Sequence, residues 1–130
     1  MTAGYSGTPL PKKLGVKPGS RVLLVSAPED LVGEMVGEGD VVADGPADVL
    51  VAFFTERAAF AAALDGLRAQ MEPDAGLWIA WPKKAAKVPT DMTEDVVREV
   101  ALPTGLVDNK VCAIDAVWSG LRLVIRLEHR

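Results

Sequence analysis

The chain of 130 residues has very little cysteine or histidine, with Cys112 and His129 as the single representatives of each. One cysteine excludes a disulfide within the chain, and this pair cannot supply the Cys/His cluster of a structural zinc site. A metal site made of carboxylates alone stays open. No apolar run approaches the roughly 20 residues that span a bilayer, and residues 1–10 lack a signal-peptide pattern. We therefore expect a cytoplasmic protein with no zinc and no membrane partner.

Charges of one sign are missing from two successive stretches. Residues 1–25 contain four cations and no acid, whereas residues 26–56 contain eight acids and no lysine or arginine. The formal net charge is -4. A surface that is acidic over much of its extent repels a nucleic acid backbone. We therefore expect no general nucleic acid binding, although the basic N-terminal segment keeps that hypothesis open.

Short apolar runs bounded by turn residues indicate strands that are buried on both faces of a sheet. They predict strands at residues 21–26, 48–54 and 77–81, and a brief strand at 40–44. An antiparallel hairpin is predicted from residues 106–115 and 121–128, because apolar and charged residues alternate along its second strand. A turn is expected at residues 73–76, which read Pro-Asp-Ala-Gly.

Helices are predicted between these strands from their capping residues. Ser26 and Glu29 have the spacing of a capping box, and Asp91 with Glu94 offers another. Thr55 can cap a third helix, which lies along the chain between the two that start at these capping boxes. Strands and helices then alternate until the closing hairpin. This order predicts an α/β three-layer Rossmann-like sandwich, with a mostly parallel sheet and a C-terminal antiparallel hairpin.

The domain organisation follows from composition. An apolar content of 49% over this length fits one core. Residues 1–19 hold three prolines and four glycines, which is typical of an irregular arm with at most one helical turn. We expect this N-terminal arm to precede a single Rossmann-like domain at residues 20–130.

Segments of the chain resemble two groups of proteins. The segments VKPGSRVLLV, DVLVAFF and PDAGLWIAW and the closing hairpin have an order and spacing that resembles class I S-adenosylmethionine-dependent methyltransferases. The segments YSGTPLPKKLG, LWIAWPKKA, TEDVVREVALPTGLVDNKVCAID and VWSGLRLV together resemble a small family of uncharacterised actinobacterial proteins, a domain of unknown function. The second resemblance implies a relationship and no mechanism.

The methyltransferase resemblance implies an acidic residue and a glycine-rich turn after the first strand, because the cofactor packs against bare backbone there. Residues 24–30 read Leu-Val-Ser-Ala-Pro-Glu-Asp and contain no glycine. A phosphate would meet Glu29 and Asp30 at the helix start, and two like charges about 5 Å apart repel by about 3 kcal/mol at a dielectric near 20. Asp44, the acid that would contact a ribose, is better interpreted as a turn residue. We therefore expect no cofactor.

The lysine loop, Lys83, Lys84 and Lys87, is the best-placed candidate binding site. Ligands of open α/β sheets bind beyond the carboxyl ends of the strands, and this loop leaves such an end. Its amines could hold a phosphate, a carboxylate or an acidic partner surface, with Trp81 as an apolar floor. The alternative is a solvated loop with Trp81 in the core. Trp118, expected at the hairpin tip, is either an exposed anchor for a partner or folded over the sheet end.

No catalytic residue is predicted. Cys112 lies in an alternating strand with no histidine to activate it, so we interpret it as a small buried residue. Ser26 lacks the flanking glycines of a nucleophile elbow. Carboxylate pairs such as Asp91 with Asp95 are what helix starts ordinarily contain. The lack of such residues predicts a protein without catalytic activity.

The sequence therefore favours a non-enzymatic interaction or regulatory domain. Its expected contact surface comprises Trp81, Lys83, Lys84 and Trp118, and its expected partner is a protein. The alternative is a binder or an enzyme for an anionic small metabolite, held at the same strand-end loop. The ligand, the partner and the oligomeric state do not follow from the sequence.

Overall fold

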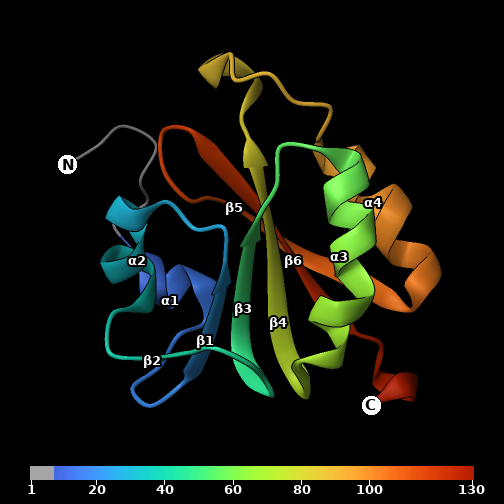
Figure 1. Ribbon diagram of the computed structural model, residues 1–130. Helices are drawn as coiled ribbons and strands as arrows, with labels where there is room; N and C mark the ends of the chain where they lie inside the picture. The colour runs from blue at the N-terminus through green and yellow to red at the C-terminus, as the bar shows by residue number, and fades with distance from the viewer. Residues whose placement is uncertain (1–7) are drawn as a thin grey trace.

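A six-stranded sheet with helices on both faces is the frame of the protein (Figure 1). The computed structural model describes residues 8–130. Along the sheet, the strand order is β2-β1-β3-β4-β6-β5. The strands are β1 (Arg21–Val25), β2 (Asp40–Val42), β3 (Ala47–Phe53), β4 (Met71–Pro82), β5 (Leu106–Ala113) and β6 (Trp118–Ile125).

The strands β2, β1, β3 and β4 run parallel, whereas β6 is antiparallel to β4 and β5 is antiparallel to β6. The predicted fold class, an α/β Rossmann-like sandwich with a mostly parallel sheet and a C-terminal antiparallel hairpin, is confirmed. Parallel strands need crossover connections; helices supply them from β1 to β2 and from β3 to β4, whereas residues 43–46 join β2 to β3 without a helix.

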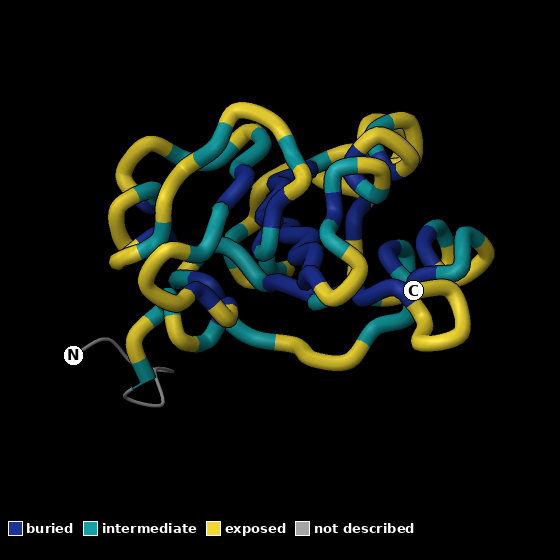
Figure 2. The backbone as a smooth tube through the Cα atoms, turned by 90° about the horizontal axis from the view of Figure 1, so that it is seen from below, coloured by how far each residue is buried: buried dark blue, intermediate teal, exposed yellow. Residues whose placement is uncertain are grey.

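Each face of the sheet has its own apolar core and its own helices. The helices α1 (Leu10–Leu14) and α2 (Glu29–Val36) cover one face, and α3 (Arg57–Ala69) and α4 (Glu94–Ala101) cover the other (Figure 1). Burial concentrates along the central strands, while the connecting loops are exposed (Figure 2). Strand side chains alternate between the faces. Trp78 accordingly belongs to the α1/α2 core and Trp81 to the α3/α4 core.

Helix α1 ties the segment before β1 to the sheet. Leu14 and Val16 are buried, at 1% and 8% exposure. The indole Nε1 of Trp78 donates a hydrogen bond to the carbonyl oxygen of Leu14 at 3.0 Å. Residues 10–16 of the segment expected to be an irregular arm are thus packed on the domain, and residues 1–7 lie outside the described residues.

The predicted cap of α2 is wrong. The helix begins at Glu29 after Pro28, with no side-chain cap, and Ser26 has a left-handed backbone with φ of 55°. The proline explains the later start. Its ring disfavours helical backbone at the residue before it, so Ala27 stays outside the helix.

The predicted caps of α3 and α4 are also wrong, because Asp91 serves the neighbouring helix. Its Oδ1 accepts a hydrogen bond from the backbone N–H of Arg57, the first residue of α3, at 2.6 Å. Thr55 instead offers its carbonyl oxygen to the hydroxyl of Thr90. Helix α4 is capped by Thr93, whose side chain accepts from the backbone N–H of Val96 at 3.1 Å. The bond between Asp91 and Arg57 joins residues that are 34 positions apart, so no local spacing in the sequence reveals it.

Strand β4 is longer than predicted and absorbs the turn expected at residues 73–76. Between the pairs Ala47–Met71 and Val49–Gly76, β3 advances by two residues and β4 by five, so β4 bulges. A bulge of this kind disrupts pairing locally and lets the strand continue. The turn residues therefore lie within an irregular part of the strand.

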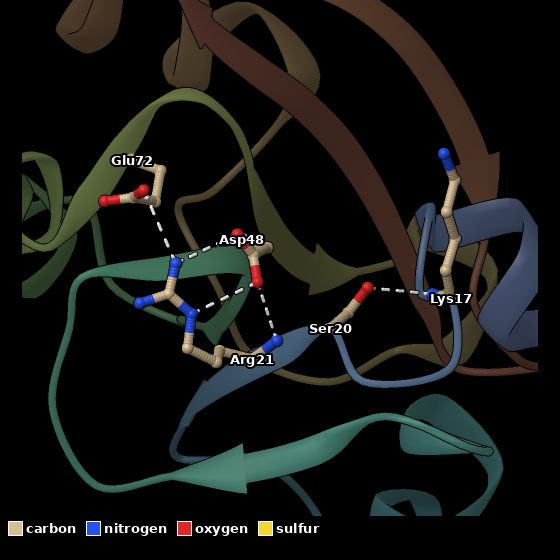
Figure 3. A network of polar contacts seen from close by, with 5 residues as sticks. All are labelled: Lys17, Ser20, Arg21, Asp48 and Glu72. Atoms are coloured by element: carbon tan, nitrogen blue, oxygen red, sulfur yellow. Dashed lines mark hydrogen bonds and ion pairs between the residues drawn. The ribbon is translucent and has the colours of Figure 1, made fainter.

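The amino ends of β1, β3 and β4 are joined by a polar network (Figure 3). Asp48 Oδ2 accepts from the backbone N–H of Arg21 at 2.8 Å, and its Oδ1 accepts from Arg21 Nη2 at 3.2 Å. Glu72 lies 3.4 Å from the same guanidinium. The hydrogen bonds from Arg21 hold the pKa of Asp48 below its usual range. The network lies at the opposite edge of the sheet from the strand ends where ligands bind in such folds.

The lowered pKa of Asp48 predicts a loss of stability in acid. Stabilisation by a carboxyl of lowered pKa is complete above its ordinary pKa and is lost as the pH falls through the folded-state value. We therefore expect the free energy of unfolding of the D48N variant to fall less steeply in acid than that of the parent protein. Urea unfolding at neutral and acidic pH measures this. The control is D74N, which removes an exposed acid of β4; an equal change in both variants would contradict the prediction.

Candidate functional site

The strand order places a switch point between β1 and β3. From β1 the chain crosses to β2 on one side, then returns to β3 on the other side and continues to β4. Ligands of open α/β sheets bind outside the carboxyl ends of the strands at such a point. The candidate site is therefore the strand-end edge, formed by the residues that follow β1, β3 and β4.

The turn after β1 carries side chains and negative charge. Ser26 is exposed in its left-handed conformation, and Ala27 packs against the α1/α2 core. Glu29 and Asp30 occupy the first turn of α2 and are both exposed. Acids in the first turn oppose the binding of an anion at a helix N-terminus.

Aromatic rings occupy the α1/α2 side of the strand-end edge. Phe53, the last residue of β3, is 4% exposed. The ring of Trp118 meets it edge-on, with centroids 5.0 Å apart and an interplanar angle of 85°. Trp118 is the first residue of β6 and lies after the hairpin turn, where Asp115 accepts from its backbone N–H at 2.8 Å. Its ring is half-buried in this core and folds back over the sheet end.

Trp81 has a different environment from Trp118. Its side chain is 7% exposed and belongs to the α3/α4 core. The two backbones are close, because Trp118 pairs with Pro82. Their rings, however, lie on opposite faces of the sheet. The structure therefore brings the lysines of the expected contact surface together but separates its two tryptophans.

The lysine loop follows β4 directly and projects beyond the sheet (Figure 1). Lys83 is half-buried, and its backbone N–H donates to Val117 O at 2.7 Å. Lys84 and Lys87 are exposed, at the two ends of the short helix η1 (Lys84–Ala86). Within residues 8–130, no carboxylate forms an ion pair with these three lysines.

The described residues bring no catalytic set together. Cys112 is half-buried, and burial raises the pKa of its thiol while Lys13 and Lys110 partly oppose the change. A thiol of raised pKa stays protonated at neutral pH and is a weak nucleophile. In the part of the chain that the structure describes, no three His, Cys, Asp or Glu side chains are arranged to hold a metal ion.

The structure forms a second cluster of cations, which the sequence does not predict. We call it the basic groove, and it comprises Lys12 and Lys13 of α1, Lys110 of β5 and Arg122 of β6. These residues line a surface hollow of about 220 Å³, and a second hollow of about 400 Å³ shares all but Arg122. The one available signal was the excess of cations over residues 1–25, which did not indicate where they would lie.

Solved structures similar to this one include methyltransferases. An S-adenosylmethionine-dependent methyltransferase from Aquifex aeolicus has a TM-score of 0.62 and 17% identity, over 88% of this chain and 87% of that chain. A putative type 11 methyltransferase from Sulfolobus solfataricus has a TM-score of 0.58 and 14% identity, over 90% and 89%. This chain has a methyltransferase-like fold. The distant resemblance to class I methyltransferases is thereby supported at the level of the fold.

Two further comparisons bear on its relationships. A structure of a fibrillarin/Nop5p complex matches with a TM-score of 0.58 and 9% identity, over 85% of this chain and 75% of that chain. No protein-family model and no curated protein sequence matches the chain. Among the described residues, no helix of the methyltransferase-like domain has the length and apolar character to cross a membrane.

Proposed function

We propose that this methyltransferase-like domain is a non-enzymatic interaction or regulatory domain that binds no adenosyl cofactor. The observation that carries the proposal is the turn after β1, from Ser26 to Asp30, at the switch point of the sheet. In class I methyltransferases this turn is rich in glycine, so that the cofactor rests on backbone.

The residues present do not suit such a cofactor. Every residue of the turn carries a side chain, and Ala27 and Pro28 are half-buried against the domain. The Trp118 ring occupies the space beside Phe53 at the neighbouring strand end. Glu29 and Asp30 in the first turn of α2 oppose the phosphates of a nucleotide, whereas S-adenosylmethionine carries no phosphate, so the case against it rests on the side chains of the turn. These features support a domain that has the methyltransferase-like fold but whose turn after β1 is filled by side chains.

A protein partner is consistent with the fold. One structural neighbour is a fibrillarin/Nop5p complex, so a protein of this fold has been solved with a protein bound. The lysine loop projects from the strand-end edge and offers exposed amines to an acidic partner surface. The proposed contact surface is therefore the lysine loop, with the tryptophans acting as support beneath it.

Calorimetric titration with S-adenosylmethionine tests this proposal. We expect no heat of binding in the micromolar range, because no open glycine turn receives the adenosyl group. The magnesium protoporphyrin IX methyltransferase of Synechocystis, which was solved with the cofactor bound, is the positive control. Micromolar affinity for S-adenosylmethionine or for a nucleotide would overturn the proposal.

A second candidate function is the binding, with or without turnover, of an anionic small metabolite at the lysine loop. The observation in its favour is the position of Lys83, Lys84 and Lys87 beyond the carboxyl end of β4, with no ion pair among the described residues. This edge is where ligands of such sheets bind. The K84Q variant used below also tests this candidate.

A further inference from the structure

The basic groove joins segments that are far apart in the sequence. Lys110 Nζ donates to the carbonyl oxygen of Lys13 at 3.4 Å, across 97 residues. Lys12 projects from the same helix, and both hollows reach it. Among residues 8–130, no carboxylate lines either hollow, although the chain as a whole has a net charge of -4. Such a local excess of cations needs a physical reason.

The side chain of Arg122 occupies the space left by the missing side chain of Gly76. A Cβ atom on Gly76 would come within 2.4 Å of Arg122 Nε and 2.9 Å of Cζ. The guanidinium therefore lies directly over the backbone of β4, where any larger residue would displace it. Burial, with a smaller effect from Arg130, lowers the pKa of Arg122. Among the described residues, this half-buried cation has no ion pair or hydrogen bond from its side chain.

The two strands also place like charges opposite each other. Lys110 of β5 and Arg122 of β6 are directly paired in the sheet register. Like charges at paired positions destabilise a sheet, and both hollows are already bordered by Lys12 and Lys13. Breaks in local rules of this kind are expected where a protein binds something. An anion between these side chains would turn the repulsion into attraction.

We infer that the basic groove binds the phosphate groups of a small molecule. Arg122 offers a planar fork of N–H donors that fits phosphate oxygens, and the lysines add mobile point charges. The hollow that Arg122 lines has about 220 Å³, and the hollow that shares the three lysines with it has about 400 Å³, which lies in the range of small-molecule sites. The inference goes beyond the proposed function and does not depend on whether an adenosyl cofactor binds at the turn after β1.

The surroundings favour a small molecule over a nucleic acid. Helix α1, which carries Lys12 and Lys13, contacts α2, and α2 belongs to a stretch with eight acids and no cation at residues 26–56. A nucleic acid strand that extended past the groove over α2 would meet acids of this stretch. Single-stranded nucleic acids also stack on exposed aromatic rings. No aromatic residue is among the exposed large apolar side chains within residues 8–130.

The test is titration of the protein with pyrophosphate, by calorimetry and by thermal shift. We expect saturable binding in the millimolar range or tighter. The R122Q variant should bind at least about tenfold more weakly, because it loses a charge-assisted pair. The G76A variant should weaken binding to a similar extent without changing any charge, because its Cβ displaces the guanidinium.

Matched controls separate this groove from other effects of charge and of glycine. K84Q removes one cation at the lysine loop, and G66A adds a methyl group to α3 where nothing lies within 4 Å. Neither should change pyrophosphate affinity. If R122Q fails to fold, G76A and K12Q carry the test.

Three results would overturn the inference. The first is the absence of saturable pyrophosphate binding to the parent protein. The second is a loss of binding in K84Q with none in R122Q, which would place the anion at the lysine loop. The third is tighter binding of a single-stranded oligonucleotide than of pyrophosphate through the same residues, which would make the ligand a nucleic acid. None of these depends on the titration with S-adenosylmethionine.

Cys112 supplies an independent readout. It is the single cysteine of the chain and lines the larger hollow beside Lys13 and Lys110. Bound pyrophosphate should slow alkylation of Cys112 by the neutral reagent iodoacetamide, by covering the thiol and by disfavouring the thiolate. This protection should be lost in R122Q. Equal protection in both proteins would contradict the assigned site.

Discussion

Replacing Trp81 with alanine is expected to lower the free energy of unfolding by about 3–5 kcal/mol, the range for truncating a buried aromatic side chain. The side chain is 7% exposed and packs in the α3/α4 core, between the sheet and its helices. Truncation leaves a cavity that the surrounding helices fill only in part. Urea unfolding, followed by circular dichroism, measures the change.

The matched comparison for this variant is W118A. Trp118 is half-buried and contacts Phe53 with one edge of its ring, so its truncation removes less packing. We expect W118A to lose clearly less stability than W81A. A W81A protein as stable as the parent would show that this ring is free for a partner, as the sequence first suggested.

Replacing Trp78 with alanine is expected to cost a similar amount, about 3–5 kcal/mol, and to loosen helix α1 as well. Trp78 is completely buried in the α1/α2 core, and its indole N–H holds the Leu14 carbonyl. Removing the ring takes away both the packing and the bond that fixes the end of α1. Urea unfolding measures the stability, and hydrogen exchange at residues 10–16 measures the loosening.

The control for this second variant is W78F, which keeps most of the ring and removes the donor. It leaves the buried carbonyl of Leu14 without its partner, a loss of roughly 1–3 kcal/mol. Hydrogen exchange should rise at residues 10–16 in both variants. Unchanged exchange in W78A would contradict the assigned role of the Trp78 bond in holding α1.

The fold was predictable because the strands of the sheet are continuous apolar runs. Burial on both faces leaves a signal that does not depend on the partner strand, as the run of residues 77–81 illustrates. The opposite placement of Trp78 and Trp81 follows from the same alternation. These features are local, so the sequence contains them directly.

The helix starts were not predictable to the same degree. Ser26, Thr55 and Asp91 are all good capping residues, yet none caps the helix to which it was assigned. Pro28 delays α2, and Asp91 bonds to Arg57, which lies 34 residues earlier. A carboxylate can cap whichever helix start lies beside it in space, and sequence spacing does not reveal that neighbour.

The two candidate sites also differ in how far the sequence predicts them. The lysine loop was visible because its three lysines are close in the sequence and follow an apolar strand. The basic groove was not visible, because Lys12 and Arg122 meet only after α1 packs against the hairpin. The contact between Gly76 of β4 and Arg122 of β6 depends on the strand register, which the sequence does not show.

The order of the strands has a consequence for a chain during synthesis. Strand β5 leaves the ribosome before β6. Because its neighbour in the sheet is β6, it cannot join the sheet until β6 has been made. Until β6 emerges, β4 keeps a bare edge, and its residues from Ala75 to Pro82 are all buried in the finished protein. Unprotected apolar edges are where nascent chains pair wrongly with each other. Of these six strands, the last to be made thus closes the sheet, and a premature stop before Trp118 would remove β6 and leave β5 without a strand to pair with.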